Sequence, residues 1–482
     1  MPGFTPGRRW QPAYTPFKRE SFGNRALAKL ELLVKGPMFG CRMCGNCLLQ
    51  ETAFICPMEC PKGLRNGPCG GATEQCYVDE SRPCIWHAIY ERAFRMGRED
   101  LLMEVLPPLD WEQVGTETWG DVARQVKKVG VKTAVSNLLS RDKKQREFIW
   151  DAIFRPVRQP DWWQGDSDYH APAYTEPASE LERRLRAGEF VVAAEIAPPM
   201  STATGKLKRE IKMLKPFVTS INFTDGASAT PRMSSQACSL MALELGAEPV
   251  MQIAARDATR TSLQSQVLGT SAMGIRNVLV VSGDSARIGV TPQSRTDILD
   301  VDSVQMLWIL RKMRDEGRYL DGRKIKFTPA MFLGAAASPF ASSPRIQAIR
   351  EHKKVNAGAQ FFQTNLVYDV EGLERWLEEL AKRDILDKVY ILAGLTPLKS
   401  WNMTRYLHEN VPGVRLPETI LKRMQTAKDA AEEGVAITLE LIEGIRKLQG
   451  INGIHLMPVG WESIIPRLVK EAGLSDAVKA AP

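Results

Sequence analysis

Two different patterns of apolar and polar residues divide the chain. From Glu180 onward, short apolar or β-branched runs alternate with longer stretches in which apolar residues recur at every third or fourth position. A short apolar run bounded by turn residues is typical of a buried strand, and the wider spacing is typical of a helix. The eight predicted strands are FVVAAEIAP, VTSINFTD, PVMQIAARD, NVLVVSGD, KIKFTPAMFLG, FFQTNLVYD, KVYILAGLTP and INGIHLMPVG.

Predicted helices separate these strands. They include 202–217, 303–317, 346–355 and 371–384, and the last interval, 418–448, is long enough for two helices. Eight strand–helix repeats favour a (β/α)8 TIM barrel, whereas an open doubly wound sheet more often has fewer strands. No Gly-x-Gly-x-x-Gly follows any of the strands, which disfavours a separate dinucleotide-binding domain. The predicted fold class is α/β, with the barrel over residues 181–482.

The part of the chain before the barrel has a different composition. Residues 88–150 carry apolar residues at helical spacing, which predicts helices. Residues 155–180 are rich in proline and aromatic residues without a period, which indicates a linker. We therefore expect an N-terminal extension over 1–35, and a small cysteine-rich metal-binding domain with a helical tail over 36–154.

Composition and charge are those of an ordinary globular protein. Of 482 residues, 44 % are hydrophobic and 25 % are charged, which argues against extensive disorder and fibrous repeats. No apolar run approaches the roughly 18 residues that span a bilayer, and the first residues lack the apolar core of a secretion signal. The net charge of +8 is spread along the chain, so it requires no nucleic acid. We expect a cytoplasmic protein that binds neither membrane nor nucleic acid, and the sequence leaves a homo-oligomer open.

Cysteines are concentrated in one short segment. Eight of the nine are Cys41, Cys44, Cys47, Cys56, Cys60, Cys69, Cys76 and Cys84. Without a secretion signal, such density favours metal ligation over disulfides. The spacing Cys-x2-Cys-x2-Cys is that by which bacterial ferredoxins hold a [4Fe-4S] cluster, whereas zinc sites use Cys-x2-Cys as separated pairs. Eight thiolates suffice for two [4Fe-4S] clusters or for one cluster and one zinc ion, and zinc alone or free thiols stay open.

Polar residues end several predicted strands, where (β/α)8 barrels carry their active sites. Glu195 ends the first strand among Ala, Val and Ile. Such apolar surroundings raise the pKa of a carboxyl group, which suits a general acid near neutral pH. A core glutamate paired with lysine or arginine is the alternative. The five histidines, His455 among them, are scattered singly and are predicted to be packing or surface residues.

The motifs at the strand ends together resemble the methylenetetrahydrofolate reductase family, which consists of flavin-bearing (β/α)8 barrels that reduce the methylene bridge of folate to a methyl group. The resemblance rests on Glu-x-x-Pro-Pro from Glu195, on Gly283-Asp284, and on KVNAGA, TNLVYD and LTPLKSW. The cysteine segment resembles the cysteine-rich subunit found with the reductase of acetogenic bacteria. The two resemblances cover about 36–100 and 188–460, as if both proteins were fused in one chain.

The resemblance implies roles for individual residues. Glu195 matches the general acid that assists opening of the five-membered folate ring, and Asp284 matches an aspartate near flavin and pterin. The positions that match the cofactor site are Thr224, Gln252, Gly283, Asp284 and Lys354, the last of these at the flavin phosphate. The positions assigned to the folate are Gln363, Asn365 and Trp401. Asn365 departs from the pattern, because the family often has glutamine there.

The implied reaction is reduction of 5,10-methylenetetrahydrofolate to 5-methyltetrahydrofolate, or the reverse, with FMN or FAD as cofactor. The iron-sulfur centres would pass electrons to or from a ferredoxin or another electron-transfer protein, and NAD(P)H is the other candidate donor. Two alternatives stay open. One is a folate-binding methyltransferase component, which would lack flavin, and the other is a reductase whose cysteine domain is a zinc-stabilised docking module without a redox role.

Overall fold

A computed structural model describes residues 21–70, 74–140, 142–154, 157, 163, 167–285, 289–291, 299–411 and 413–475. Two compact units make up the chain. The first comprises Met1–Pro68 and Pro83–Asp166, and the second comprises Cys69–Arg82 and Ser167–Pro482. Much of the predicted extension and part of the predicted linker lie outside the described residues. The short stretch Cys69–Arg82 belongs to the same unit as the C-terminal part of the chain.

The first unit is helical around an irregular cysteine-rich loop. Its helices are α1 (Phe22–Phe39), α2 (Ile85–Arg95), α3 (Trp119–Val129), α4 (Val131–Leu138) and α5 (Lys143–Ile149). The helical spacing that starts at residue 88 is interrupted early, because α2 is short. This helix ends at Arg95 because Gly97 adopts a left-handed conformation with φ of 63°, and a short 3-10 turn, Glu99–Met103, follows.

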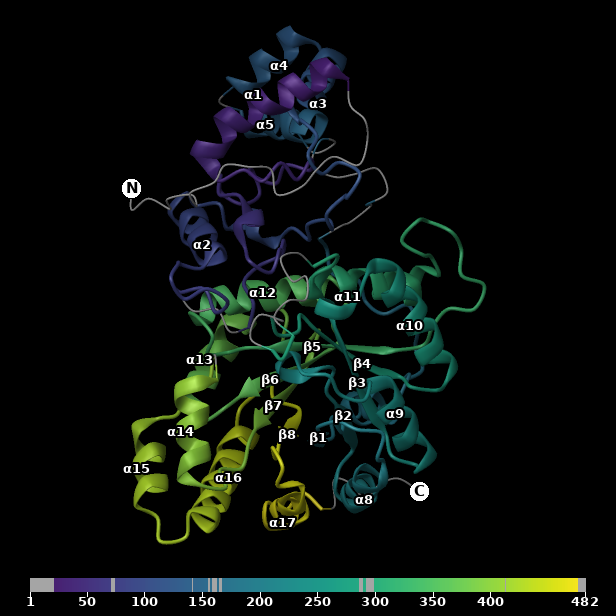
Figure 1. The fold of residues 1–482 in the computed structure, drawn as a ribbon, viewed down its shortest axis with the longest axis vertical. Coiled ribbons are helices and arrows are strands. Elements are labelled where there is room, and N and C mark those ends of the chain that lie inside the picture. The colour runs from purple at the N-terminus through teal and green to yellow at the C-terminus, as the bar shows by residue number, and fades with distance from the viewer. Residues whose placement is uncertain are drawn as a thin grey trace. The chain divides into compact units, whose positions relative to one another are not determined.

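The second unit is a closed barrel of eight parallel strands in the order β1 to β8 (Figure 1). The strands are β1 (Val191–Ile196), β2 (Ser220–Phe223), β3 (Pro249–Ala254), β4 (Asn277–Val281), β5 (Phe332–Ala337), β6 (Phe361–Leu366), β7 (Tyr390–Leu395) and β8 (Gly453–Leu456). The helices are α7 (Glu180–Arg186), α8 (Gly205–Leu214), α9 (Ser235–Glu244), α10 (Arg260–Ala272), α11 (Ser303–Arg311), α12 (Pro344–Asn356), α13 (Val370–Ala381), α14 (Trp401–Asn410), α15 (Glu418–Thr426), α16 (Ala430–Arg446) and α17 (Ile465–Glu471). The predicted (β/α)8 barrel is confirmed.

The strands and helices of the barrel follow the sequence pattern closely, with one displacement. The long interval after residue 418 forms two helices, α15 and α16, as its length predicts. The predicted fifth strand begins at residue 324, whereas β5 begins at Phe332. Lys324 instead forms an isolated antiparallel bridge with Arg318. Pro329, which has no N–H to donate to a ladder, separates that bridge from the strand. Among the described residues, no helix is both long and apolar enough to cross a bilayer.

Apolar side chains fill the amino-terminal half of the barrel interior. The buried cluster contains Leu181, Leu185, Val191, Ala193, Val250, Leu279, Phe332, Phe361 and Leu392. The rings of Phe332 and Phe361 stack with their centroids 4.7 Å apart. Gly334 leaves room for this stack, since a β-carbon there would lie 2.2 Å from the Phe361 ring. Because side chains alternate along a strand, the next inward positions after Ala193 and Val250 are Glu195 and Gln252, above the apolar cluster.

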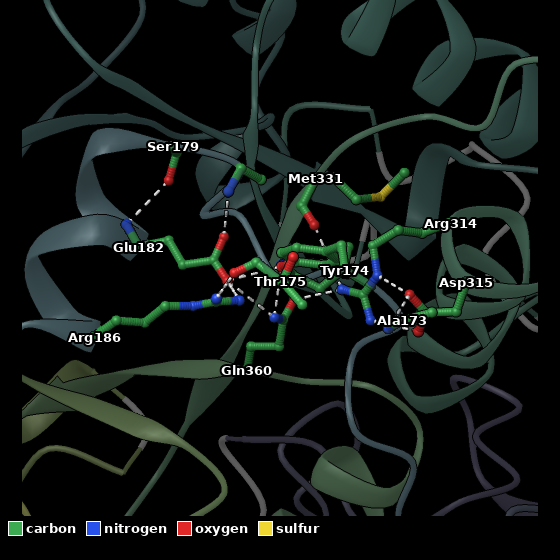
Figure 2. Close-up of polar contacts among 12 residues, drawn as sticks. Ala173, Tyr174, Thr175, Ser179, Glu182, Arg186, Arg314, Asp315, Met331 and Gln360 are labelled. Atoms are coloured by element: carbon green, nitrogen blue, oxygen red, sulfur yellow. Dashed lines mark hydrogen bonds and ion pairs between the residues drawn. The ribbon is translucent and has the colours of Figure 1, made fainter.

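A polar cluster fastens the segment before β1 to the amino-terminal end of the barrel (Figure 2). The Tyr174 phenol donates a hydrogen bond to Glu182 Oε1 (2.9 Å) and accepts one from Gln360 Nε2 (2.7 Å). The guanidinium groups of Arg186 and Arg314 each lie 5.3 Å from the Tyr174 ring centroid. Since Gln360 directly precedes β6, these contacts hold α7 across the end of the barrel opposite the carboxyl ends of the strands.

The stacked pair predicts a stability defect. Changing Gly334 to Ala should lower the free energy of unfolding by about 1–3 kcal/mol, because the added methyl group displaces the Phe361 ring from a packed core. Urea denaturation followed by circular dichroism measures the change. The matched control is Gly205→Ala at the start of α8, where the nearest atom to a new β-carbon is Arg209 Nη1 at 3.6 Å. Equal stability of the two variants would contradict the prediction.

Candidate functional site at the carboxyl end of the barrel

Glu195 lies where three strands bring polar groups together. Its Oε2 atom is 3.4 Å from Gln252 Nε2 on β3 and 3.6 Å from His455 Nε2 on β8. The side chain of Glu195 is 21 % exposed, so it is largely withdrawn from water but reachable from the barrel mouth. The neighbours that hold this carboxyl group are an amide and an imidazole, in contrast to the lysine or arginine partner that the alternative interpretation requires.

His455 was not predicted to belong to this site. It is buried on β8, and its Nδ1 atom has no hydrogen-bond partner among the described residues. The prediction of a surface or packing residue treated each histidine separately and ignored strand alternation. In the run GIHL, Ile454 and Leu456 face the helices, so the residue between them must point into the barrel. That signal was available in the sequence.

Asp284 follows β4 in a loop that shapes its surroundings. Its Oδ2 atom accepts the Ser228 N–H (2.8 Å), and its Oδ1 atom accepts a hydrogen bond from the Tyr77 phenol (3.4 Å). Gly283 has φ of 74°, and a β-carbon there would lie 3.1 Å from the Arg256 side chain. Glycine is therefore needed for the tight turn that presents Asp284.

The predicted folate residues have different environments. Gln363 is buried and donates from Nε2 to Asn222 Oδ1 (3.1 Å), so its amide is engaged inside the barrel. Asn365 lies at the shift in register between β6 and β7, and its Oδ1 accepts the Leu366 N–H (2.9 Å). Trp401 is half-buried at the first position of α14, after the loop that leaves β7.

Lys354 is fully buried on α12. Its ammonium group lies 2.7 Å from Glu351 Oε2 and also donates to the Ala336 carbonyl. Burial, reinforced by nearby Arg350 and opposed by Glu351, lowers the pKa of Lys354 to about 8. The ammonium thus already has protein partners, and its predicted contact with a flavin phosphate stays a prediction.

In the first unit, four of the eight clustered cysteines line one cavity: Cys41, Cys44, Cys47 and Cys56. The backbone N–H two residues further along donates to a sulfur in three cases, from Met43 to Cys41 (3.4 Å), from Leu49 to Cys47 and from Met58 to Cys56. Burial and then the neighbouring thiols Cys44 and Cys47 raise the pKa of Cys41 to about 12, although Met43 opposes the shift. Protons are therefore hard to remove unless a cation compensates the charge.

Helix α1 brings a cation to this cavity. Lys35 Nζ lies 3.8 Å from Cys47 Sγ and 2.8 Å from Thr118 Oγ1, and it pairs with Glu31. Burial lowers the pKa of Lys35, but Cys47 and Glu31 outweigh it and raise the pKa above its ordinary value. Lys35 and Glu31 fall within the predicted extension 1–35, to which no role was assigned.

The loop that carries the first three of these cysteines needs its glycine. Gly45 has φ of 78°, and a β-carbon there would lie 2.1 Å from the Gln113 carbonyl oxygen. Met43 also adopts a left-handed conformation, with φ of 51°, although it is not glycine. A close approach of two backbone segments therefore gives the loop its shape.

The other four clustered cysteines are divided between the units. Cys60 and Cys84 belong to the first unit, whereas Cys69 and Cys76 belong to the second. All nine cysteines are free thiols in the structure. Among the described residues, no group of three or more His, Cys, Asp or Glu side chains has the arrangement that holds a single metal ion.

Two families of known proteins match this chain. The family described as methylenetetrahydrofolate reductase matches residues 180–473, and the one described as methylene-tetrahydrofolate reductase C terminal matches residues 22–112. The first match spans the whole barrel. The chain belongs to the methylenetetrahydrofolate reductase family.

Individual relatives are more distant. Methylenetetrahydrofolate reductase 1 of Schizosaccharomyces pombe is 26 % identical over 213 residues, which are 42 % of this chain and 32 % of the relative. The chain thus spans about a third of the length of this curated relative. A solved structure of an uncharacterized Clostridium thermocellum protein that binds two copies of 5-methyl-5,6,7,8-tetrahydrofolic acid has 16 % identity and a TM-score of 0.44, covering 62 % of this chain and 99 % of that one. The Bacillus cereus spore cortex-lytic enzyme SleL has 14 % identity and a TM-score of 0.35, covering 59 % and 74 %.

The family typically binds flavin, and the residues at the barrel mouth fit such a ligand. Thr224 is buried at the end of β2, and its Oγ1 atom has no hydrogen-bond partner in the described part of the chain. The same holds for His455 Nδ1. Buried polar atoms normally have partners, so these two are suited to a bound heterocycle with several donors and acceptors.

The buried Lys354–Glu351 pair predicts a second stability defect. Lys354→Met should lower the free energy of unfolding by about 3–5 kcal/mol, because the buried Glu351 carboxylate loses its ammonium partner and keeps only the more distant Arg350 guanidinium (4.0 Å) as a cation. Urea denaturation measures this loss, and the double variant Lys354→Met, Glu351→Leu should recover most of it. Flavin content of the double variant then shows whether Lys354 also serves the phosphate. A single variant as stable as the wild type would contradict the prediction.

Proposed function

We propose that this chain is a flavin-dependent oxidoreductase that reduces 5,10-methylenetetrahydrofolate to 5-methyltetrahydrofolate, or catalyses the reverse. One observation carries the proposal: Glu195, Gln252 and His455 meet at the carboxyl end of a barrel that belongs to the methylenetetrahydrofolate reductase family. Thr224 and Gln252 would hold the flavin there, and the bound flavin supplies the hydride.

Glu195 is the proposed general acid. The methylene carbon of the substrate bridges two nitrogens, and one carbon–nitrogen bond must break before the carbon becomes an electrophilic iminium. A proton given by Glu195 to the departing nitrogen makes that nitrogen a better leaving group. The Gln252 amide and the His455 imidazole approach the same carboxyl oxygen from two strands, so they orient the proton donor.

Asp284 is the proposed electrostatic partner of the cation. A carboxylate beside the iminium carbon stabilises the positive charge that develops as the ring opens. The Ser228 N–H fixes one oxygen of Asp284, so the carboxylate does not have to reorient during the reaction. Folate contacts are proposed for Asn365, Trp401 and Gln363, and the Gln363 amide also donates to Asn222.

Replacement of Glu195 by Gln tests the acid role. The variant keeps its flavin, because the amide preserves the size of the side chain, but turnover of methylenetetrahydrofolate should fall by about 10²–10⁴-fold since no proton is available. Steady-state kinetics and the flavin absorbance spectrum measure the two effects. Glu371→Gln on the exposed face of α13 is the matched control. Near-normal turnover in Glu195→Gln would remove this residue from the acid role.

We further propose that Cys41, Cys44, Cys47 and Cys56 hold a [4Fe-4S] cluster, which passes electrons one at a time. The shared cavity, the N–H groups directed at three sulfurs and the ammonium of Lys35 all suit a centre with negatively charged sulfur ligands. The Cys-x2-Cys-x2-Cys spacing of the first three is that of ferredoxin ligands, and zinc at the same thiols is the alternative.

The remaining cysteines, Cys60, Cys69, Cys76 and Cys84, stay predicted metal ligands, for a cluster or for zinc, and no common centre is proposed for them because they belong to different units. With iron-sulfur centres present, a ferredoxin-like protein is the proposed electron donor, and NAD(P)H is the alternative. FMN or FAD is the proposed flavin. Zinc without iron in the purified protein would instead favour a docking module.

Replacement of Cys44 by Ala tests the cluster. Anaerobically purified Cys44→Ala should lose about four iron atoms per chain, because one cubane ligand is missing, whereas flavin absorbance should be unchanged. Iron, zinc and flavin are measured on the same sample. Cys238→Ala is the matched control, since this buried thiol lies on α9 in the barrel unit. Undetectable iron in the wild-type protein would contradict the assignment.

A further inference from the structure

A short arm of the cysteine-rich segment reaches the candidate active site. The arm is Cys69–Arg82, which belongs to the barrel unit, and the structure describes 69–70 and 74–82 of it. We propose that this arm forms part of the active-site wall and that Tyr77 is a positioning residue that holds the Asp284 carboxylate in its working orientation. The proposal rests on the proposed function, because it deepens the role of Asp284.

Two points on the arm touch the loops at the carboxyl end of the barrel. At Gly70, a β-carbon would lie 2.7 Å from Ser338 Oγ, directly after β5. The Gly70 carbonyl oxygen is 3.1 Å from the position of a β-carbon on Gly413, beyond α14. Tyr77 contacts the loop after β4 through Asp284. The described residues of the arm therefore contact the loops that follow β4 and β5, at the end of the barrel that also carries Glu195.

The visible part of the arm is braced internally. The Cys76 N–H donates to the Arg82 carbonyl (3.0 Å), which closes the chain into a turn. Within this turn, Asp79 accepts hydrogen bonds from the Ser81 hydroxyl (2.6 Å) and N–H (3.3 Å). Tyr77 thus projects from a turn with its own hydrogen bonds and is suited to a fixed position.

The Asp284 carboxylate is held from two sides. Tyr77 donates to Oδ1, and the Ser228 N–H donates to Oδ2. Ser228 and Ala229 have φ of 57° and 49°, a left-handed conformation that is costly for residues with a β-carbon. This strained turn directs the Ser228 N–H to one oxygen, while the arm supplies the donor for the other. With either donor missing, the carboxylate could rotate.

The arm contributes a hydrogen-bond donor to Asp284, the Tyr77 hydroxyl, that the strands and helices of the barrel do not supply. The two donors come from segments far apart in the sequence, one before the first helix of the barrel unit and one between β2 and α9. A carboxylate that stabilises a developing cation must point at it before the bond breaks, since reorientation during the reaction raises the barrier. Tyr77 therefore affects the rate of the chemical step more than substrate binding.

The test is Tyr77→Phe, which removes only the hydroxyl group. We expect kcat with methylenetetrahydrofolate to fall about tenfold while KM stays within about twofold, as a loss confined to the transition state requires. Tyr406→Phe on α14 is the matched control, because that tyrosine is 60 % exposed. Wild-type kcat in Tyr77→Phe would overturn the proposal.

A double-mutant cycle with Asp284→Asn separates positioning from a general packing role. If Tyr77 acts through Asp284, then Tyr77→Phe should change kcat by less than twofold in the Asp284→Asn background. The same tenfold loss in both backgrounds would show that the phenol acts independently of Asp284 and would overturn the proposal.

Hydrogen–deuterium exchange of the protein without substrate gives a readout that does not depend on activity. Tyr77→Phe should speed exchange in peptides covering 225–230 and 282–285, and Asp284→Asn should speed exchange over 74–82. If Tyr77→Phe fails to fold, the Asp284→Asn variant still tests the proposal. Unchanged exchange over 74–82 in that variant would overturn it. A wild-type protein that holds flavin but does not turn over methylenetetrahydrofolate would contradict the proposed function alone, and the exchange data would still test the contact.

Discussion

Closure of the barrel between its first and last strands is the constraint on which the rest depends. In the register of β1 and β8, Ala193 lies opposite His455, and Val191 lies opposite Gly453. A β-carbon on Gly453 would stand 2.4 Å from the Val191 carbonyl oxygen, so glycine permits the two strands to pair. Only this pairing brings His455 to Glu195, which in turn has Gln252 as its neighbour on β3.

Residues that stabilise the barrel and residues proposed to act in catalysis lie at opposite ends of the barrel axis. Apolar side chains around the stacked Phe332 and Phe361 fill one half, and the Tyr174 cluster fastens the segment that precedes β1 at that end. Polar groups with incomplete hydrogen bonding, such as Thr224, stand in the other half. Strained backbone also gathers there, at Ser228 and its neighbour, where tertiary contacts hold a conformation that the local sequence disfavours.

In the cysteine-rich unit, backbone N–H groups and one lysine position the functional side chains, in place of a regular sheet. Without a large sheet to orient its side chains, it uses backbone N–H groups two residues after three of its cysteines and one lysine from α1 to surround the sulfurs. The close packing of Gly45 on Gln113 gives the loop its shape. Six of the clustered cysteines belong to this unit, and Cys69 and Cys76 go with the barrel. Spacing along the chain groups all eight together and cannot reveal that division.

The sequence by itself determined the barrel, because strand and helix periodicity are local properties. It also determined that the side chain of Glu195 points into the barrel, because alternation along β1 is local as well. It predicted two helices after residue 418, and both are present. It missed the end of α2 at Arg95 and displaced the start of β5, where a glycine and a proline override helical or strand spacing. Tertiary structure alone decided that His455 faces Glu195, that Lys354 is buried against Glu351, and that Tyr77 reaches Asp284. The contacts of His455 and Tyr77 join residues far apart in the sequence, and the Lys354–Glu351 pair is local on α12 but is buried only by what packs against that helix, so none of the three leaves a periodic signal in the sequence.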